Sequence, residues 1–88
     1  MISYNELTKI LDKLGMDKNL TSIEFRENGP EIDHTKELTL LDRTCRAVIA
    51  FSYSTSNQYQ KETRMIYYRR KDAPRGYILD LEEFLKDD

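Results

Sequence analysis

The chain has 88 residues, of which 39% are hydrophobic and 34% charged, and its formal net charge is −2 at pH 7. We expect a single domain over residues 1–88 with a thin core, because a chain of this size buries roughly 60 to 65% of its unfolded surface. The slightly acidic balance argues against a whole-protein electrostatic attraction to nucleic acid, which is typical of strongly basic domains.

Two further features of the composition indicate where the protein works. Cys45 is the only cysteine, which excludes an internal disulfide and fits a reducing compartment. The start of the chain lacks a basic region followed by an apolar run, and no stretch approaches the roughly 18 apolar residues of a transmembrane helix. We therefore expect a cytoplasmic protein without a membrane partner.

The first residues predict a helix over about residues 4 to 14. Ser3 and Glu6 form a capping-box pattern, in which each side chain satisfies a free backbone N–H of the first turn. Gly15 suits the position just past the helix, because glycine tolerates positive φ. The apolar residues that recur at helical spacing and should face the core are Tyr4, Leu7, Ile10, Leu11 and Leu14.

A strand is predicted next, over residues 21–26, where apolar and polar side chains alternate until an Asn-Gly-Pro sequence at 28–30. Residues 31–44 leave two interpretations open. Leu38 and Leu40 fit a short edge strand, whereas a helical period joins a different set: Leu38, Leu41, Cys45 and Val48.

The strongest strand signal begins at Cys45. Val48 and Ala50 lie on one side of this strand and a run of larger apolar residues lies on the other, which suggests a central strand covered on both sides. A polar loop over 54–58 and renewed alternation over 61–70 predict that the strand continues into a hairpin. The larger apolar side of the first strand consists of Cys45, Ala47, Ile49, Phe51 and Tyr53.

A turn and a short helix are predicted to complete the chain. Residues 71–76 have turn composition, with Pro74 presetting one dihedral angle and Gly76 permitting an unusual one. Asp80 with Glu83 repeats the capping pattern before the apolar stripe of a helix. The fold class is therefore α+β: a small antiparallel sheet of about three or four strands, with the N-terminal helix and the short C-terminal helix packed on one face.

Catalytic, metal and cofactor sites are not predicted. His34, the sole histidine, lies in a polar connector, and Cys45 opens a core strand where a buried thiol behaves as a small hydrophobe. The acidic residues lack the spacing of known metal motifs, and the three glycines stand at element boundaries rather than in a phosphate-binding loop.

One strip does have the composition of a recognition surface, because it combines arginines with tyrosines. Arginine offers planar charged donors, and tyrosine offers rigid aromatic area that is ordered at little entropic cost. On a strand, Arg64, Tyr68 and Arg70 share one face. The predicted partner-binding residues are Arg64, Tyr67, Tyr68, Arg69, Arg70, Arg75 and Tyr77.

Several interpretations of this strip stay open. The first is a small non-enzymatic protein-binding module, an inhibitor or adaptor of a larger protein, of the kind that phages and mobile elements encode. The second is binding of single-stranded nucleic acid by the same residues, and the third is a small ribonuclease-type toxin. A homodimer is a further expected form of partnership. The structural alternative is an edge strand kept soluble by positive charge, whose arginines are neutralised by the acidic tail.

Overall fold

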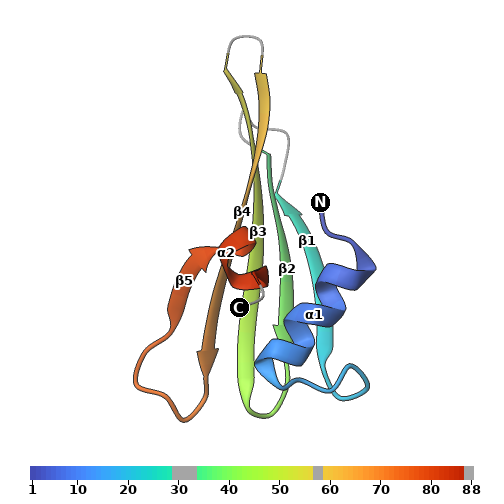
Figure 1. Ribbon diagram of the computed structural model, residues 1–88, viewed down its shortest axis with the longest axis vertical. Coiled ribbons are helices and arrows are strands. Elements are labelled where there is room, and N and C mark those ends of the chain that lie inside the picture. Colours follow the sequence, from blue (N-terminus) through green and yellow to red (C-terminus); the bar gives the residue numbers. More distant parts are fainter. Residues whose placement is uncertain (29–33, 57–58, 87–88) are drawn as a thin grey trace.

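The computed structural model describes residues 1–28, 34–56 and 59–86, which form one mixed α+β domain (Figure 1). Each strand pairs antiparallel with its neighbours in the chain, so the five-stranded sheet has the order β1-β2-β3-β4-β5. The expectation of three or four strands was therefore too low. The elements are α1 (Tyr4–Leu14), β1 (Ser22–Asn28), β2 (His34–Leu41), β3 (Cys45–Ser56), β4 (Tyr59–Arg70), β5 (Tyr77–Asp80) and α2 (Leu81–Leu85). The loop predicted over 54–58 was therefore wrong for residues 54–56, which belong to β3, and residues 57–58 lie outside the described part of the chain.

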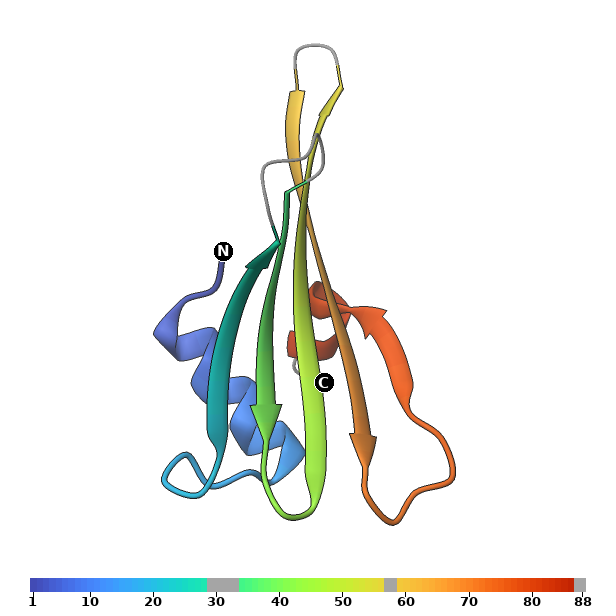
Figure 2. The same cartoon turned by 180° about the vertical axis from the view of Figure 1, so that it is seen from behind.

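Both helices pack on the same face of the sheet, as expected. Figure 1 shows α1 and α2 in front of the strands, and Figure 2 shows the opposite side, where no described element covers the sheet. We call this uncovered side the helix-free face. The molecule thus has two layers, with one sheet surface in the core and the other in contact with solvent.

Helix α1 begins and ends at the capping residues that the sequence predicts. The Ser3 side chain accepts a hydrogen bond from the Glu6 amide at 3.1 Å, and the Ser3 amide donates to the Glu6 carboxylate at 3.0 Å. Gly15 has φ of 69°, in the left-handed region, and its N–H donates to the carbonyls of Asp12 and Leu11. These contacts satisfy backbone groups that the first and last turns leave free.

The segment that the sequence left open contains a strand. β2 pairs with β1 over Thr35–Leu41 and with β3 over its whole length, so it is an interior strand and not the expected edge strand. Leu38 and Leu40 are 8% and 0% exposed on the helix-covered side. The helical interpretation is therefore wrong for His34–Leu41, because period-two burial and two strand partners determine this conformation. Residues 31–33 lie outside the described part of the chain.

The core lies between β3 and the helices, but β3 is covered on one side only. Ile49 and Phe51 of β3 are fully buried together with Ile10 and Leu14 of α1, and Tyr53 on the same side is partly buried. Val48 and Ala50 on the other side are only partly buried. The expectation of coverage on both sides was wrong, because no described element packs against the helix-free face of this strand.

The sequence also missed β5, which has only four residues and leads directly into α2. Asp80 ends the strand and caps the helix, with its side chain accepting from the Glu82 amide at 3.2 Å. Gly76 precedes the strand without a positive φ, contrary to expectation. A Cβ there would lie 2.7 Å from Cε2 of Tyr67, so close packing requires the glycine.

The two isoleucines at 66 and 78 test the two-layer arrangement, because they lie on neighbouring strands at 0% and 70% exposure. We expect Ile66→Ala to lower the free energy of unfolding by about 2 to 5 kcal/mol, since it opens a cavity in the core. Ile78→Ala should change it by no more than about 0.5 kcal/mol. Urea unfolding followed by circular dichroism measures both, and equal losses would contradict the arrangement.

Candidate interaction surface

Strand β4 distributes the predicted partner-binding residues between its two faces. Ile66 is fully buried toward the helices, and the period-two alternation of a strand places Arg64, Tyr68 and Arg70 on the same side. Tyr67 and Arg69 belong to the helix-free face. The seven predicted residues therefore do not form one surface.

Arg64 connects both ends of the chain to the sheet. Its Nη2 donates to the Glu6 carboxylate of α1 at 2.8 Å, and its Nε donates to the Glu82 carboxylate of α2 at 2.9 Å. Its Nη1 donates to the Met1 carbonyl at 3.0 Å. With a side chain only 16% exposed, this guanidinium stabilises the fold. The pairing of Arg64 with Glu82 agrees with the neutralisation in the structural alternative raised from the sequence. The edge-strand part of that alternative is wrong, because β4 pairs with both β3 and β5.

The ion pair changes the titration of both partners. Hydrogen bonds from Arg64 and from the Ser3 amide lower the pKa of Glu6 to about 2, because they favour the ionised carboxylate. The hydrogen bonds that Arg64 makes to Glu6 and Glu82 raise the pKa of its guanidinium above the usual arginine value. Both groups therefore stay charged throughout the physiological pH range.

The other residues on the helix-covered side also have internal partners. Arg70 donates from Nη1 to the Leu14 carbonyl at 3.1 Å, which satisfies a free acceptor at the end of α1. The Tyr68 ring stacks on Tyr77 with a centroid distance of 5.3 Å and lies 5.6 Å from the Phe84 ring of α2. Tyr77 remains 56% exposed at the β5 edge. These contacts hold α1 and α2 on the sheet.

On the helix-free face, Tyr67 and Arg69 are fixed by the connection between β4 and β5. The Tyr67 ring approaches Gly76 so closely that no other side chain fits there. Arg69 donates from Nε and Nη2 to the Ala73 carbonyl at 3.2 and 3.1 Å. Arg75 is an exposed residue of the same connection. The two strand residues are thus preorganised rather than free to rotate.

The centre of the helix-free face is apolar. Strand pairing aligns Val48, Tyr67 and Ile78 in one row across β3, β4 and β5, and Ala50 and Met65 adjoin one another in the next row. Ile78 is 70% exposed, and the other four are partly buried. Ile78 was not predicted to belong to this surface because β5 was not predicted, and Val48 was assigned to a covered surface. We call these five residues the apolar centre.

A basic end adjoins the apolar centre. A shallow cavity of about 250 Å³ is lined by Leu41, Tyr67 and three cationic side chains, those of Arg46, Arg69 and Lys71. The segments 42–46 and 69–75 that form this end contain six lysine or arginine residues and two aspartates, in a chain whose net charge is −2. We call Arg46, Arg69 and Lys71 the basic end.

One of these two aspartates serves the turn between β2 and β3. Asp42 Oδ1 accepts hydrogen bonds from the amides of Thr44 and Cys45, each at 2.8 Å. Partial burial opposes ionisation of this carboxyl, but the hydrogen bonds and the nearby charge of Lys71 lower its pKa below the usual value. The Asp42 carboxylate therefore holds the turn in its ionised form and also faces the charge of Lys71.

The structure describes Cys45 and most of the possible metal ligands considered from the sequence. No group of three or more histidine, cysteine or acidic residues there is arranged to hold a metal ion. Cys45 is 0% exposed, and burial raises the pKa of its thiol, which disfavours the reactive thiolate. The side chain of His34, the other residue considered from the sequence, lies outside the described atoms.

No protein-family model, curated protein or solved structure matches this chain. None of the described helices is long and apolar enough to cross a membrane. We therefore infer the function from the chain's own surfaces. The apolar centre with its basic end combines an exposed Ile78 with three cationic side chains.

The ion pair between Glu6 and Arg64 makes stability depend on pH. With a folded pKa of about 2 and an ordinary value of 4.5, Glu6 stabilises the fold above about pH 4.5, and this contribution is lost as pH falls toward 2. Allowing for partial exposure, Glu6→Gln should cost about 2 kcal/mol at pH 7 and flatten the acid dependence.

Glu83→Gln is the matched control, because the Glu83 side chain is 67% exposed and its ion pair is with Lys86, three residues away on the same segment. Urea unfolding at a series of pH values between neutral and strongly acidic measures both variants. If Glu6→Gln retains the acid dependence of the unchanged chain, the ion pair does not have the proposed role.

Proposed function

We propose that the protein is a non-enzymatic protein-binding module, an inhibitor or adaptor, that docks on a larger protein through its helix-free face. The observation that carries the proposal is the apolar centre at solvent, on strands whose opposite side forms the core. Strand β3 has apolar side chains on both sides, and the helices cover only one of them. A partner surface would cover the other.

The contact residues are suited to a stable interface. Tyr67 is held by its approach to Gly76, so that binding need not restrict a freely rotating aromatic side chain. Arg69 is aligned by its two hydrogen bonds to Ala73. A rigid aromatic and an anchored arginine beside exposed apolar area are typical of the residues that dominate binding energy in interfaces.

Charge selects the kind of partner. The basic end lies beside the apolar centre, so a complementary surface would present apolar side chains next to a group of carboxylates. In this proposal Tyr67, Arg69 and Arg75 of the predicted set contact the partner. Arg64, Tyr68, Arg70 and Tyr77 support the surface from the other side of the sheet.

Neighbouring residues on β5 provide a matched test, because Ile78 and Tyr77 point to opposite faces and are 70% and 56% exposed. The tagged chain captures proteins from its native host, and quantitative mass spectrometry compares variants. We expect Ile78→Ala combined with Arg46→Glu to reduce the specific partner roughly 30-fold or more, as loss of a 2 kcal/mol hot spot implies. Tyr77→Ala should retain it.

Circular dichroism melts establish that both variants are folded before capture. If Tyr77→Ala lost the partner and the double variant retained it, the interface would lie on the helix-covered side instead. A partner that both variants retain would remove the helix-free face as the docking surface.

Single-stranded nucleic acid is the second candidate, favoured by the cavity in which Tyr67 lies beside three cationic groups. A base stacked on a tyrosine contributes roughly 1 to 3 kcal/mol, and the cations would contact phosphates. The affinity for a labelled oligonucleotide should then fall with salt with a logarithmic slope of about −0.7 per phosphate contacted. Fluorescence anisotropy measures this, and no binding at low salt would exclude the candidate.

A further inference from the structure

The β1 edge of the sheet is apolar on its helix-covered side. β1 pairs with β2 on one side and is the outer strand of the described sheet on the other. Ile23 and Phe25 are 45% and 49% exposed, although both point to the side where the helices lie. An edge strand with exposed apolar side chains is a template for pairing with another strand.

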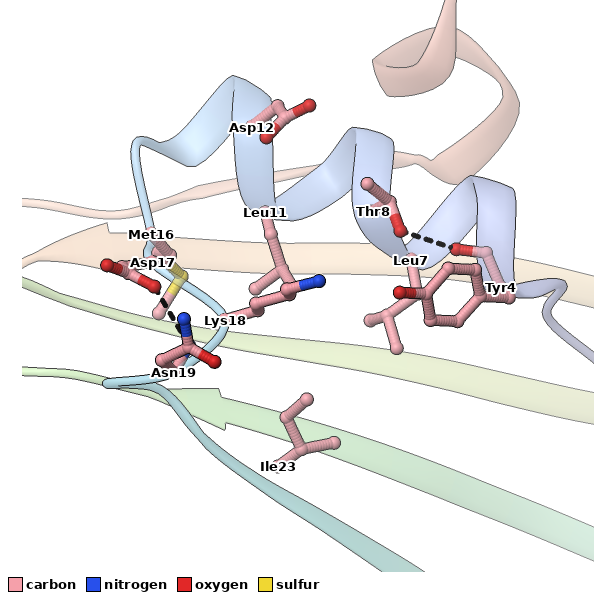
Figure 3. A pocket seen from close by; sticks show the side chains of 10 residues that line it. All are labelled: Tyr4, Leu7, Thr8, Leu11, Asp12, Met16, Asp17, Lys18, Asn19 and Ile23. Atoms are coloured by element: carbon pink, nitrogen blue, oxygen red, sulfur yellow. Dashed lines mark hydrogen bonds between the residues drawn. The ribbon is translucent and has the colours of Figure 1, made fainter.

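Helix α1 extends past β1 and lines one side of a groove beside this edge. Figure 2 shows the N-terminal part of α1 projecting past β1, and Figure 3 shows Leu7 and Leu11 pointing from the helix toward the strand of Ile23. These residues, with Met16 and Tyr4, line a groove of about 510 Å³. Tyr4 is 70% exposed. A strand added to β1 would place the side chains of its helix-covered side in this groove, which also has polar lining residues such as Lys18 and Asn19.

We propose that β1 pairs antiparallel with β1 of a second copy of this chain, centred on Phe25. Symmetric antiparallel pairing places some residue opposite itself, because opposed residues must point to the same face of the sheet. The choice of centre is therefore limited to single residues of the strand. The charges of β1 distinguish among these centres.

Centring on Phe25 makes the two strands complementary. Glu24 of one copy then lies opposite Arg26 of the other, and the same pair recurs on the far side of the axis. Opposite charges facing one another across two strands are stabilising, whereas like charges are destabilising. The two Phe25 rings meet on the helix-covered side, where their exposed area is removed from water.

The adjacent centres lack this complementarity. Centring on Glu24 opposes two carboxylates, and centring on Arg26 opposes two guanidinium groups. Centring on Ile23 places Glu24 opposite Ser22 and leaves Arg26 without a charged partner in the other strand. Of these four centres, only Phe25 places Glu24 and Arg26 opposite each other. Glu27, the third charged residue of β1, then lies opposite Ile23 and keeps its ion pair with Lys36 of its own copy at 3.8 Å. The alternating charges of β1 thus favour the second copy as occupant and this register.

The dimer would contain one continuous sheet of ten strands, five from each copy. Its two-fold axis is perpendicular to the sheet, so both helix-free faces lie on the same side. The pairing is independent of the proposed docking function, because it uses the edge of β1 rather than the apolar centre.

Charge reversal tests the register. Glu24→Arg alone opposes two pairs of arginines, and Arg26→Glu alone opposes two pairs of glutamates. We expect each variant to sediment as a monomer where the unchanged chain sediments at twice its 10.5 kDa mass. An equimolar mixture restores both opposite pairs and should sediment as the dimer.

Three results of this experiment would overturn the proposal: a monomeric unchanged chain at every concentration, dimeric single variants, or a mixture that remains monomeric. Circular dichroism verifies folding, because Arg26→Glu also places a carboxylate opposite Glu37 of β2.

Cross-linking tests the same register without a charge change. Phe25→Cys places two thiols opposite one another, so mild oxidation should give a disulfide-linked dimer. Ile23→Cys is the control, because its two copies would be offset by four residues, or about 13 Å. The native Cys45 is buried and remains in both variants. Equal cross-linking of the two variants, or none at position 25, would contradict the pairing.

Discussion

The ion pairs of Arg64 join both helices to the same side of the sheet. A guanidinium on β4 binds Glu6 of α1 and Glu82 of α2, residues that lie near opposite ends of the chain. Because a largely buried charge is costly unless it is paired, both helices are held over the same strand. With both helices held on one side by these ion pairs and by the apolar core, the described part of the chain leaves the opposite face of the sheet without a cover.

That asymmetry gives the sheet two chemically different surfaces. The covered side uses its arginines and tyrosines internally, to hold carbonyls, carboxylates and rings of the two helices. The helix-free face combines an apolar centre with a basic end, and its main aromatic group, Tyr67, is locked against Gly76. Recognition is proposed for this second surface because its groups are ordered and their outer sides remain available to a partner.

The elements with strong local signals were predictable from the sequence. The capping box at Ser3, the alternation of β3 and β4 and the stop at Gly15 all depend on neighbouring residues, and the fold class followed from their order. β2 and β5 were not predictable, because their short or ambiguous patterns become strands only by pairing with neighbours distant in the sequence.

The candidate site was predicted in part, for a related reason. The strip on β4 was identified by composition, but composition does not show which side of a strand the helices will cover. Arg64 and Tyr68 point to the helix-covered side, and Tyr67 and Arg69 point to the helix-free face. Ile78 was missing from the predicted site because it enters the surface only through the pairing of β5.

Hydroxyl-radical footprinting in the presence and absence of the captured partner tests the central claim most directly. Met65 and Tyr67 report on the helix-free face, and Tyr4 and Tyr77 report on the helix-covered side. A partner docked on the helix-free face should protect Met65 and Tyr67 and leave Tyr4 and Tyr77 as reactive as in the free chain. Protection of Tyr4 and Tyr77, with Met65 and Tyr67 still reactive, would contradict it.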